Sequence, residues 1–228
     1  MHKYFIIFPH AGAIRSSYAY IEKSLREDVE VIYVEYDLCA TNIGSFEEFL
    51  DSIWGFLKKR ITRINADIYV FAHSMGNYIV QAIENVMVSQ YYVQEIIYSD
   101  GEIINSVVGL NLKTKSQHDV IQMIDNEYDI PDEIKENSIL AEHFRKKLIS
   151  DLSIIDLIPD YSRKLKQFKL SSEVSHRVVL SDYMDKKATI TEWLEICANP
   201  TFIYLNGGHY AVLEKRNEKN VFPLAICK

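Results

Sequence analysis

Short apolar runs alternate with longer amphipathic stretches along most of the chain. An apolar run of about four to eight residues is typical of a strand buried on both faces of a parallel sheet. The first run ends at Pro9, which has no N–H to continue a ladder of hydrogen bonds. On this basis six strands are predicted, at 3–8, 29–36, 67–72, 93–99, 177–181 and 201–205.

The stretches between these runs have the period of amphipathic helices. Within 46–61, apolar residues recur at positions 46, 49, 50, 53, 54 and 57, which places them on one face of a helix. Ser45, directly before that helix, is a candidate N-cap. Further helices are predicted at 18–25, 75–88 and around 191–197. Strands that alternate with helices predict an α/β fold with a mainly parallel sheet flanked by helices.

One segment interrupts this alternation. Residues 111–161 contain no convincing strand, but they carry helical patterns at 120–124 and 139–148, separated by Pro131. A helical insertion between core strands is typical of a lid over a binding site. We therefore expect one domain, 1–228, with a lid insertion at about 111–161.

Composition and charge exclude several classes of protein. The 228 residues carry a net charge of −7, which argues against a nucleic-acid-binding protein, and no apolar run reaches the length of a transmembrane helix. Cys39, Cys197 and Cys227 are far apart and form no CxxC pair, so neither a disulfide framework nor a zinc site is indicated. We expect a cytoplasmic monomer that holds no metal and meets neither membrane nor nucleic acid.

The sequence FAHSMGN, residues 71–77, joins a predicted strand to a predicted helix. A serine on a sharp strand-to-helix turn is exposed for attack, and the crowding of that turn requires small residues on both sides. Ser74 has Ala72 two positions before it and Gly76 two positions after it. This pattern identifies Ser74 as a candidate nucleophile, which needs a base and a group that orients the base.

A candidate base follows the last predicted strand. His209 lies in the sequence NGGHY, and two of the chain's 8 glycines, Gly207 and Gly208, directly precede it. Since glycine is kept where positive φ or close backbone approach is needed, this loop is predicted to be a constrained one that positions His209.

The orienting acid should follow the preceding strand, 177–181. Two carboxylates are available there, Asp182 and Asp185. We favour Asp185, because it lies in the turn after the strand and can reach His209, and we keep Asp182 as the alternative. The chain order serine, aspartate, histidine is that of α/β-hydrolases.

Two backbone N–H groups are needed to bind the oxyanion of an acyl-transfer intermediate. One normally belongs to the residue after the nucleophile, here Met75. The loop after the first strand, FPHAGA, supplies Ala11 as the other. We interpret His10 and His73 as loop and shell residues without a direct catalytic role.

Together these motifs resemble a known family, the type II thioesterases, which are stand-alone editing enzymes of non-ribosomal peptide and polyketide synthases. FPHAGA (8–13) is similar to that family's FPxAGG signature, AHSMGN (72–77) to its GHSMG elbow and NGGHY (206–210) to its GGHF/GGHY box. YSDG (98–101) stands where the family often has an SG-containing strand end. RKKLISDLSIIDLIPDY (145–161) resembles its L-R-A-D segment, which is followed by a tyrosine.

The resemblance implies an α/β-hydrolase fold with Ser74 as nucleophile, His209 as base and Asp185 as acid. It also implies Ala11 and Met75 as oxyanion donors. The loop around Asp185 lacks the glycines and proline of the family's GGxxDP loop, which is a further reason to keep the alternative acid open.

The function that this resemblance implies is hydrolysis of acyl or aminoacyl thioesters on carrier proteins. The substrate would bring its own phosphopantetheine arm, so no cofactor is expected, and the partners would be acyl or peptidyl carrier protein domains. The clusters Arg145-Lys146-Lys147 and Arg163-Lys164 are candidate contacts for these acidic domains. The alternative is another serine hydrolase, such as a small-molecule esterase, or an acyltransferase or cyclase with the same triad.

Overall fold

A single parallel sheet forms the centre of the molecule. The computed structural model describes residues 2–40, 43–127, 136–165 and 168–228. Six strands pair in the order β2-β1-β3-β4-β5-β6, and every pairing is parallel. The strands are β1 (Lys3–Phe8), β2 (Val29–Tyr33), β3 (Asp67–His73), β4 (Tyr92–Ser99), β5 (Ser175–Leu180) and β6 (Thr201–Tyr204). The predicted α/β fold is confirmed.

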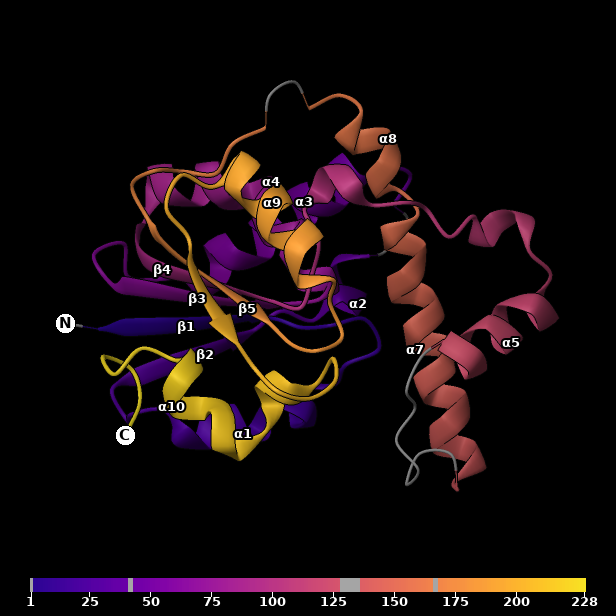
Figure 1. Ribbon diagram of the computed structural model, residues 1–228, viewed down its shortest axis with the longest axis horizontal. Coiled ribbons are helices and arrows are strands. Elements are labelled where there is room, and N and C mark those ends of the chain that lie inside the picture. The colour runs from indigo at the N-terminus through magenta and orange to yellow at the C-terminus, as the bar shows by residue number, and fades with distance from the viewer. Residues whose placement is uncertain (1, 41–42, 128–135, 166–167) are drawn as a thin grey trace.

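Helices connect the strands and cover both faces of the sheet (Figure 1). The α-helices are α1 (Ala19–Ser24), α2 (Tyr36–Cys39), α3 (Phe46–Arg60), α4 (Met75–Gln90), α5 (Gln117–Glu127), α7 (Ser138–Ile155), α8 (Ile158–Ser162), α9 (Lys186–Ile196) and α10 (Glu218–Val221). Short 3-10 helices are η1 (Arg15–Tyr18), η2 (Ile104–Ser106), η3 (Leu112–Thr114), η4 (Ala211–Leu213) and η5 (Lys215–Asn217). None of the described helices is long and apolar enough to cross a membrane.

Alternate side chains of the central strands enter two separate cores. In β1, Tyr4, Ile6 and Phe8 pack in the core under α3, α4 and α9, whereas Phe5 and Ile7 pack on the opposite face, toward α1 and α10. All five side chains are fully buried. Burial on both faces explains why the strand is an unbroken apolar run.

Helix α3 begins as predicted, whereas the end of β2 and the start of α9 differ from the prediction by three residues or more. The Ser45 side chain accepts a hydrogen bond from the Glu48 N–H at 3.2 Å, which makes it the N-cap of α3. The predicted strand 29–36 ends instead at Tyr33, because the chain turns into α2 and the Tyr36 hydroxyl donates to the carbonyl of Pro9 at 2.9 Å. Helix α9 begins at Lys186, five residues before the expected helix at about 191.

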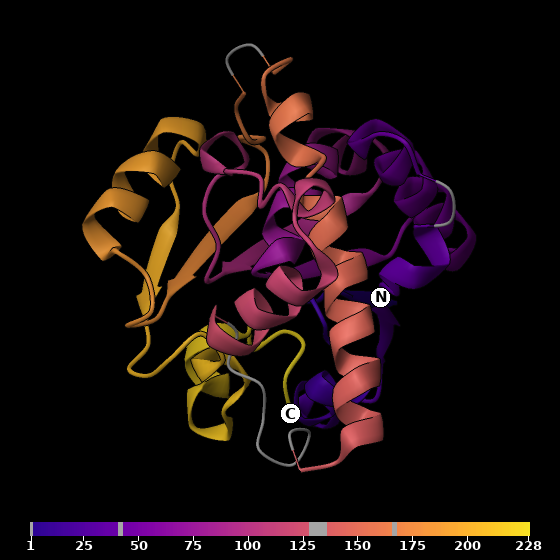
Figure 2. The same ribbon diagram turned by 90° about the vertical axis from the view of Figure 1, so that its right-hand side faces the viewer.

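Between β4 and β5 the chain forms the helical insertion that the sequence indicated. Its helices α5 and α7 lie at the side of the sheet away from the amino terminus, and in Figure 2 α7 runs in front of the strand ends. Pro131 lies outside the described residues. The helical content predicted for this segment is confirmed, and its role as a lid stays a prediction.

Candidate active site

Ser74 occupies a strained turn between β3 and α4. Its backbone has φ 53° and ψ −114°, a region that non-glycine residues rarely adopt and that concentrates at functional sites. A Cβ atom on Gly76 would lie 2.2 Å from the carbonyl oxygen of Phe8. The small residue expected two positions after the serine is therefore required by the contact between α4 and the end of β1.

The neighbouring strand β4 fixes this turn. The carbonyl of Ser99, the last residue of β4, accepts hydrogen bonds from the Ser74 N–H at 2.9 Å and from Asn77 Nδ2 at 3.1 Å. Directly after it, Asp100 has a positive φ of 44°. The end of β4 and the serine turn therefore form one hydrogen-bonded unit, in which Ser74 and Asp100 follow adjacent parallel strands.

His209 lies in the loop that follows β6, and its backbone is held by the strand of the nucleophile. His73 Nε2 donates to the carbonyl oxygen of His209 at 2.9 Å. Burial lowers the pKa of His209 to about 4, so its imidazole is neutral at pH 7 and can accept a proton. Its Nδ1 atom is buried and has no hydrogen-bond partner among the described residues.

Asp100 is the buried carboxylate of this site. The side chain is 3% exposed, and its Oδ1 accepts a hydrogen bond from the N–H of Ser181 at 2.7 Å. Burial raises the pKa of Asp100 to about 6, and the hydrogen bonds from Ser181 oppose that shift. Its other oxygen, Oδ2, is buried without a partner in the described part of the chain.

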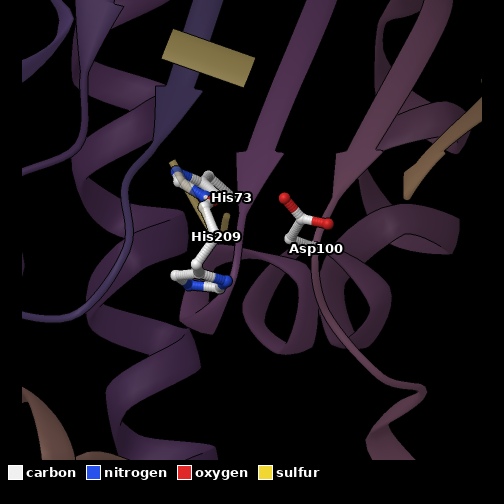
Figure 3. A group of neighbouring side chains, drawn as sticks. All are labelled: His73, Asp100 and His209. Carbon is white, nitrogen blue, oxygen red and sulfur yellow. Dashed lines mark hydrogen bonds between the residues drawn. The ribbon is translucent and has the colours of Figure 1, made fainter. Parts of the chain in front are cut away.

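The unpartnered atoms of Asp100 and His209 complement each other. One ligand atom of each of Asp100, His209 and His73 lies within 4.8 Å of the other two, and Figure 3 shows the three side chains near the strand ends. A buried polar atom without a partner costs about 1–3 kcal/mol. A hydrogen bond from His209 Nδ1–H to Asp100 Oδ2 would satisfy both atoms, and hydrogen bonds of this kind often tighten only when substrate binds.

The same three residues are a poor metal site. Both ring nitrogens of His73 are already in hydrogen bonds, Nε2 with the His209 carbonyl and Nδ1 with the Tyr18 hydroxyl at 3.2 Å. A metal ion would have to break one of these buried contacts. The arrangement suits a hydrogen-bonded pair of acid and base better.

The two carboxylates considered from the sequence lie elsewhere. Asp185 is exposed at the N-cap of α9, where its side chain accepts hydrogen bonds from two backbone N–H groups of the first turn. Asp182 is also exposed; it pairs with Lys186 at 2.8 Å and accepts from the Gly207 N–H at 2.9 Å. Since both side chains have other partners at the surface, the geometry favours Asp100 over Asp185 as the partner of His209.

A cavity of about 590 Å³ lies over these residues. Ser74, Asp100 and His209 all line it, so these three residues border one space. Its apolar wall includes Val107, Val108, Leu110, Leu152 and Ile155. Of these, Leu152 and Ile155 belong to α7, so the insertion contributes directly to the cavity.

The expected oxyanion donors are available in the right loops. Within the described residues, no acceptor takes a hydrogen bond from the N–H of Ala11 or Met75. By contrast, the N–H groups of His10, Gly12 and Ala13 donate to Tyr18, Asp151 and His10. Ala11 also lines the cavity, and Met75 follows Ser74 at the start of α4. Two unused donors near the serine are what a tetrahedral oxyanion needs.

Behind the site, Tyr18 joins two buried histidines. Its hydroxyl lies 2.7 Å from His10 Nδ1 and 3.2 Å from His73 Nδ1, and it accepts from the His10 N–H at 3.0 Å. Burial lowers the pKa of His10 to about 3 and that of His73 well below its ordinary value, with nearby histidines adding to both shifts. Both rings are therefore neutral, in keeping with the shell role expected for them.

Comparisons with known proteins find likeness in structure alone. No family model matches the sequence, and no curated protein matches it. Many solved structures do match. ClbQ from the colibactin NRPS/PKS pathway is 15% identical with a TM-score of 0.73, over 97% of this chain and 94% of ClbQ.

Two further structures are similar over nearly their whole length. The type II thioesterase BorB from the borrelidin biosynthetic cluster is 19% identical with a TM-score of 0.73, over 95% of this chain and 89% of BorB. The RedJ thioesterase from the prodiginine pathway of Streptomyces coelicolor is 16% identical with a TM-score of 0.71, over 95% and 86%. The chain therefore has the α/β-hydrolase fold of thioesterases from these biosynthetic pathways.

Proposed function

We propose that the protein is a thioesterase that releases acyl or aminoacyl groups from the phosphopantetheine arm of carrier proteins. The observation that carries the proposal is Ser74, held in a strained turn on the wall of a cavity that His209 and Asp100 also line. The similarity in fold to type II thioesterases of NRPS/PKS pathways favours a thioester over an oxygen ester. An editing role in such a pathway follows from the same similarity.

The reaction proceeds in two stages. His209 Nε2 takes the proton of the Ser74 hydroxyl as Oγ attacks the thioester carbonyl, and the N–H groups of Ala11 and Met75 bind the oxyanion. The carbon–sulfur bond then breaks, and His209 returns the proton to the departing thiol. In the second stage His209 takes a proton from the water that attacks the acyl-enzyme carbonyl. The bond from the acyl carbon to Oγ then breaks, His209 returns the proton to Ser74 Oγ, and the carboxylic acid leaves.

We assign the orienting role to Asp100. An ionised carboxylate that accepts from His209 Nδ1–H selects the tautomer in which Nε2 faces the nucleophile, and it stabilises the imidazolium that forms during attack. Asp100 is buried and has one oxygen unused, whereas Asp185 is exposed and caps α9. This assignment replaces Asp185 in the triad that the sequence suggested.

The carrier-protein partner is proposed on charge and on the position of the insertion. Of the basic cluster at 145–147, Lys147 pairs with Asp37 and with buried Asp151, so it belongs to the interior of the fold. Lys146 is 70% exposed, and its ion pair with Glu142 is a surface pair of the kind that contributes little. We therefore assign contact with an acidic carrier domain to Arg145 and Lys146.

The test of the proposed function combines covalent labelling with a comparison of substrates. A fluorophosphonate should add once to the wild-type protein and not to Ser74→Ala, as read by intact-protein mass spectrometry. Acyl groups on holo carrier protein should be released by the wild type and retained with Ser74→Ala. Labelling that persists in Ser74→Ala would remove Ser74 from the mechanism, and faster hydrolysis of matched oxygen esters would indicate an esterase.

A further inference from the structure

Helix α7 is tied to the loop that carries the oxyanion donor. The Asp151 carboxylate, fully buried on α7, accepts a hydrogen bond from the N–H of Gly12 through Oδ2 at 2.7 Å. Gly12 directly follows Ala11 in the loop after β1. The hydrogen bond joins residues 139 positions apart in the chain, so it fixes the insertion against the core at the active site.

Among the described residues, the cation that pairs with Asp151 is Lys147. Lys147, one turn earlier on α7, lies 3.3 Å from Oδ1 and 3.2 Å from Oδ2, and it also pairs with Asp37 of α2 at 3.3 Å. Burial raises the pKa of Asp151 to about 6, and Lys147 and the Gly12 N–H oppose that shift. A buried carboxylate that accepts a hydrogen bond from a loop N–H, and not from its own helix, indicates a role in fixing that loop.

The loop is also shaped to receive α7. Gly12 has φ +79°, and a Cβ on it would lie 3.3 Å from both Leu148 and Phe144 of α7. Ala11 packs against the small core that Leu148 and Leu152 of α7 form with the insertion. The backbone of residues 11 and 12 therefore packs against α7. The N–H of Gly12 donates to Asp151, whereas the N–H of Ala11 has no acceptor among the described residues.

We propose that Asp151 is a positioning residue for the oxyanion hole, so that the Ala11 N–H is correctly placed only while α7 is seated on the loop. The proposal rests on the function proposed above. The carboxylate fixes the peptide next to Ala11, so its loss frees the loop. The Ala11 N–H must be positioned relative to the oxyanion to within tenths of an ångström, and a free loop does not hold it there. The insertion thereby controls chemistry as well as access.

Three variants separate positioning from general stability. Asp151→Ala removes the acceptor for Gly12. Asp151→Asn keeps an oxygen that can accept from Gly12 while removing the charge that pairs with Lys147. The matched control is Asp156→Ala. Asp156 directly follows α7 and accepts hydrogen bonds from the N–H groups of Asn111 and Leu112 at 2.8 and 2.6 Å. It does not contact the oxyanion loop.

Two readouts are needed, thioester kinetics and the rate of fluorophosphonate labelling. Loss of one oxyanion donor costs on the order of 10²–10³ in kcat, so we expect Asp151→Ala to approach a 10²-fold loss in kcat with little change in KM. Labelling of Ser74 should slow in parallel, because the phosphonyl oxygen uses the same donors. Asp151→Asn should recover part of both rates, and Asp156→Ala should keep the wild-type kcat and labelling rate.

The outcomes separate failure of this inference from failure of the proposed function. Wild-type protein that labels at Ser74, together with Asp151→Ala that labels equally fast while still folded by circular dichroism, would overturn the inference alone. Equal losses in Asp151→Ala and Asp156→Ala would overturn it as well, since general loosening of the insertion would explain both. Wild-type protein that neither labels nor hydrolyses any thioester would overturn both proposals.

Discussion

Replacing Asp100 by asparagine should make the protein more stable and almost inactive. The substitution keeps an oxygen that can accept from the Ser181 N–H, and it replaces the other oxygen and the buried charge by a neutral NH2 group. The pKa of Asp100 rises from 3.8 to about 6 because burial disfavours the ionised form. Two pKa units correspond to about 3 kcal/mol of unfolding free energy.

The pH at which this difference is seen follows from the direction of the shift. Because the folded-state pKa is above the unfolded one, the contribution of Asp100 to stability is fully present below about pH 4. It is lost as the pH rises through about 6. Asparagine does not titrate. We therefore expect the unfolding free energy of Asp100→Asn, measured in urea, to exceed that of wild type by up to about 3 kcal/mol more at pH 8 than at pH 4.

Activity should move in the opposite direction. Loss of an orienting carboxylate from a coupled triad lowers kcat on the order of 10⁴-fold, because the base adopts the wrong tautomer. The control is Asp185→Asn, which should keep both activity and stability, since asparagine is as good an N-cap as aspartate. Acyl-thioester hydrolysis at pH 8 measures both variants.

Two results would refute this reasoning. If Asp185→Asn lost activity and Asp100→Asn kept it, the acid would be in the turn after β5, as the sequence suggested. If the stability gap between wild type and Asp100→Asn were the same at pH 4 and pH 8, Asp100 would not be a charge held against its desolvation cost.

Two further predictions concern the serine turn and the docking surface. Gly76→Ala would place a Cβ 2.2 Å from the carbonyl oxygen at the end of β1. We therefore expect the free energy of unfolding, measured by urea titration, to fall by about 1–3 kcal/mol or more. Wild-type stability in this variant would show that the contact relaxes freely. Arg145→Glu with Lys146→Glu should raise KM for acyl carrier protein and leave a small N-acetylcysteamine thioester unaffected. The matched control is charge reversal at the exposed residues Lys58 and Lys59. An equal rise in KM for acyl carrier protein from that change would argue against a local docking site.

The sequence predicted best the features that depend on burial over several residues. The strand 3–8 is apolar throughout because each of its faces meets a core, and the helix after Ser45 carries its apolar residues on one stripe. Such sequence patterns do not depend on which particular elements pack against each other. Ser74 and His209 were predicted for a related reason, since each follows a strand and lies two positions from a glycine, Gly76 or Gly207, that the backbone needs.

The structure favours another acid than the sequence did, because nearness across the sheet is not written in the local sequence. Asp185 lies in the turn expected for it, but α9 begins directly after it and takes its carboxylate as a cap. Asp100 lies at the end of the strand next to that of the nucleophile, and the motif YSDG contains it. An aspartate between a buried strand and a glycine was the available signal; only the strand order places it beside Ser74.

The hydroxyl of Tyr18 determines where the hydrogens of both neighbouring histidines lie. A carbonyl oxygen can only accept, so His73 Nε2 carries a hydrogen for His209, and the neutral His73 ring then presents a bare Nδ1. The single hydrogen of Tyr18 must point to that atom. Because the Tyr18 hydrogen is used for His73, His10 Nδ1 must donate to the Tyr18 oxygen, which also accepts from the His10 N–H.

This assignment fixes the polarity of one wall of the cavity. With its hydrogen on Nδ1 and a pKa of about 3, His10 keeps Nε2 as a lone pair across the whole neutral range. His10 lines the cavity next to Ala11, whose N–H is a donor. His10 therefore adds no positive charge beside the Ala11 N–H at neutral pH.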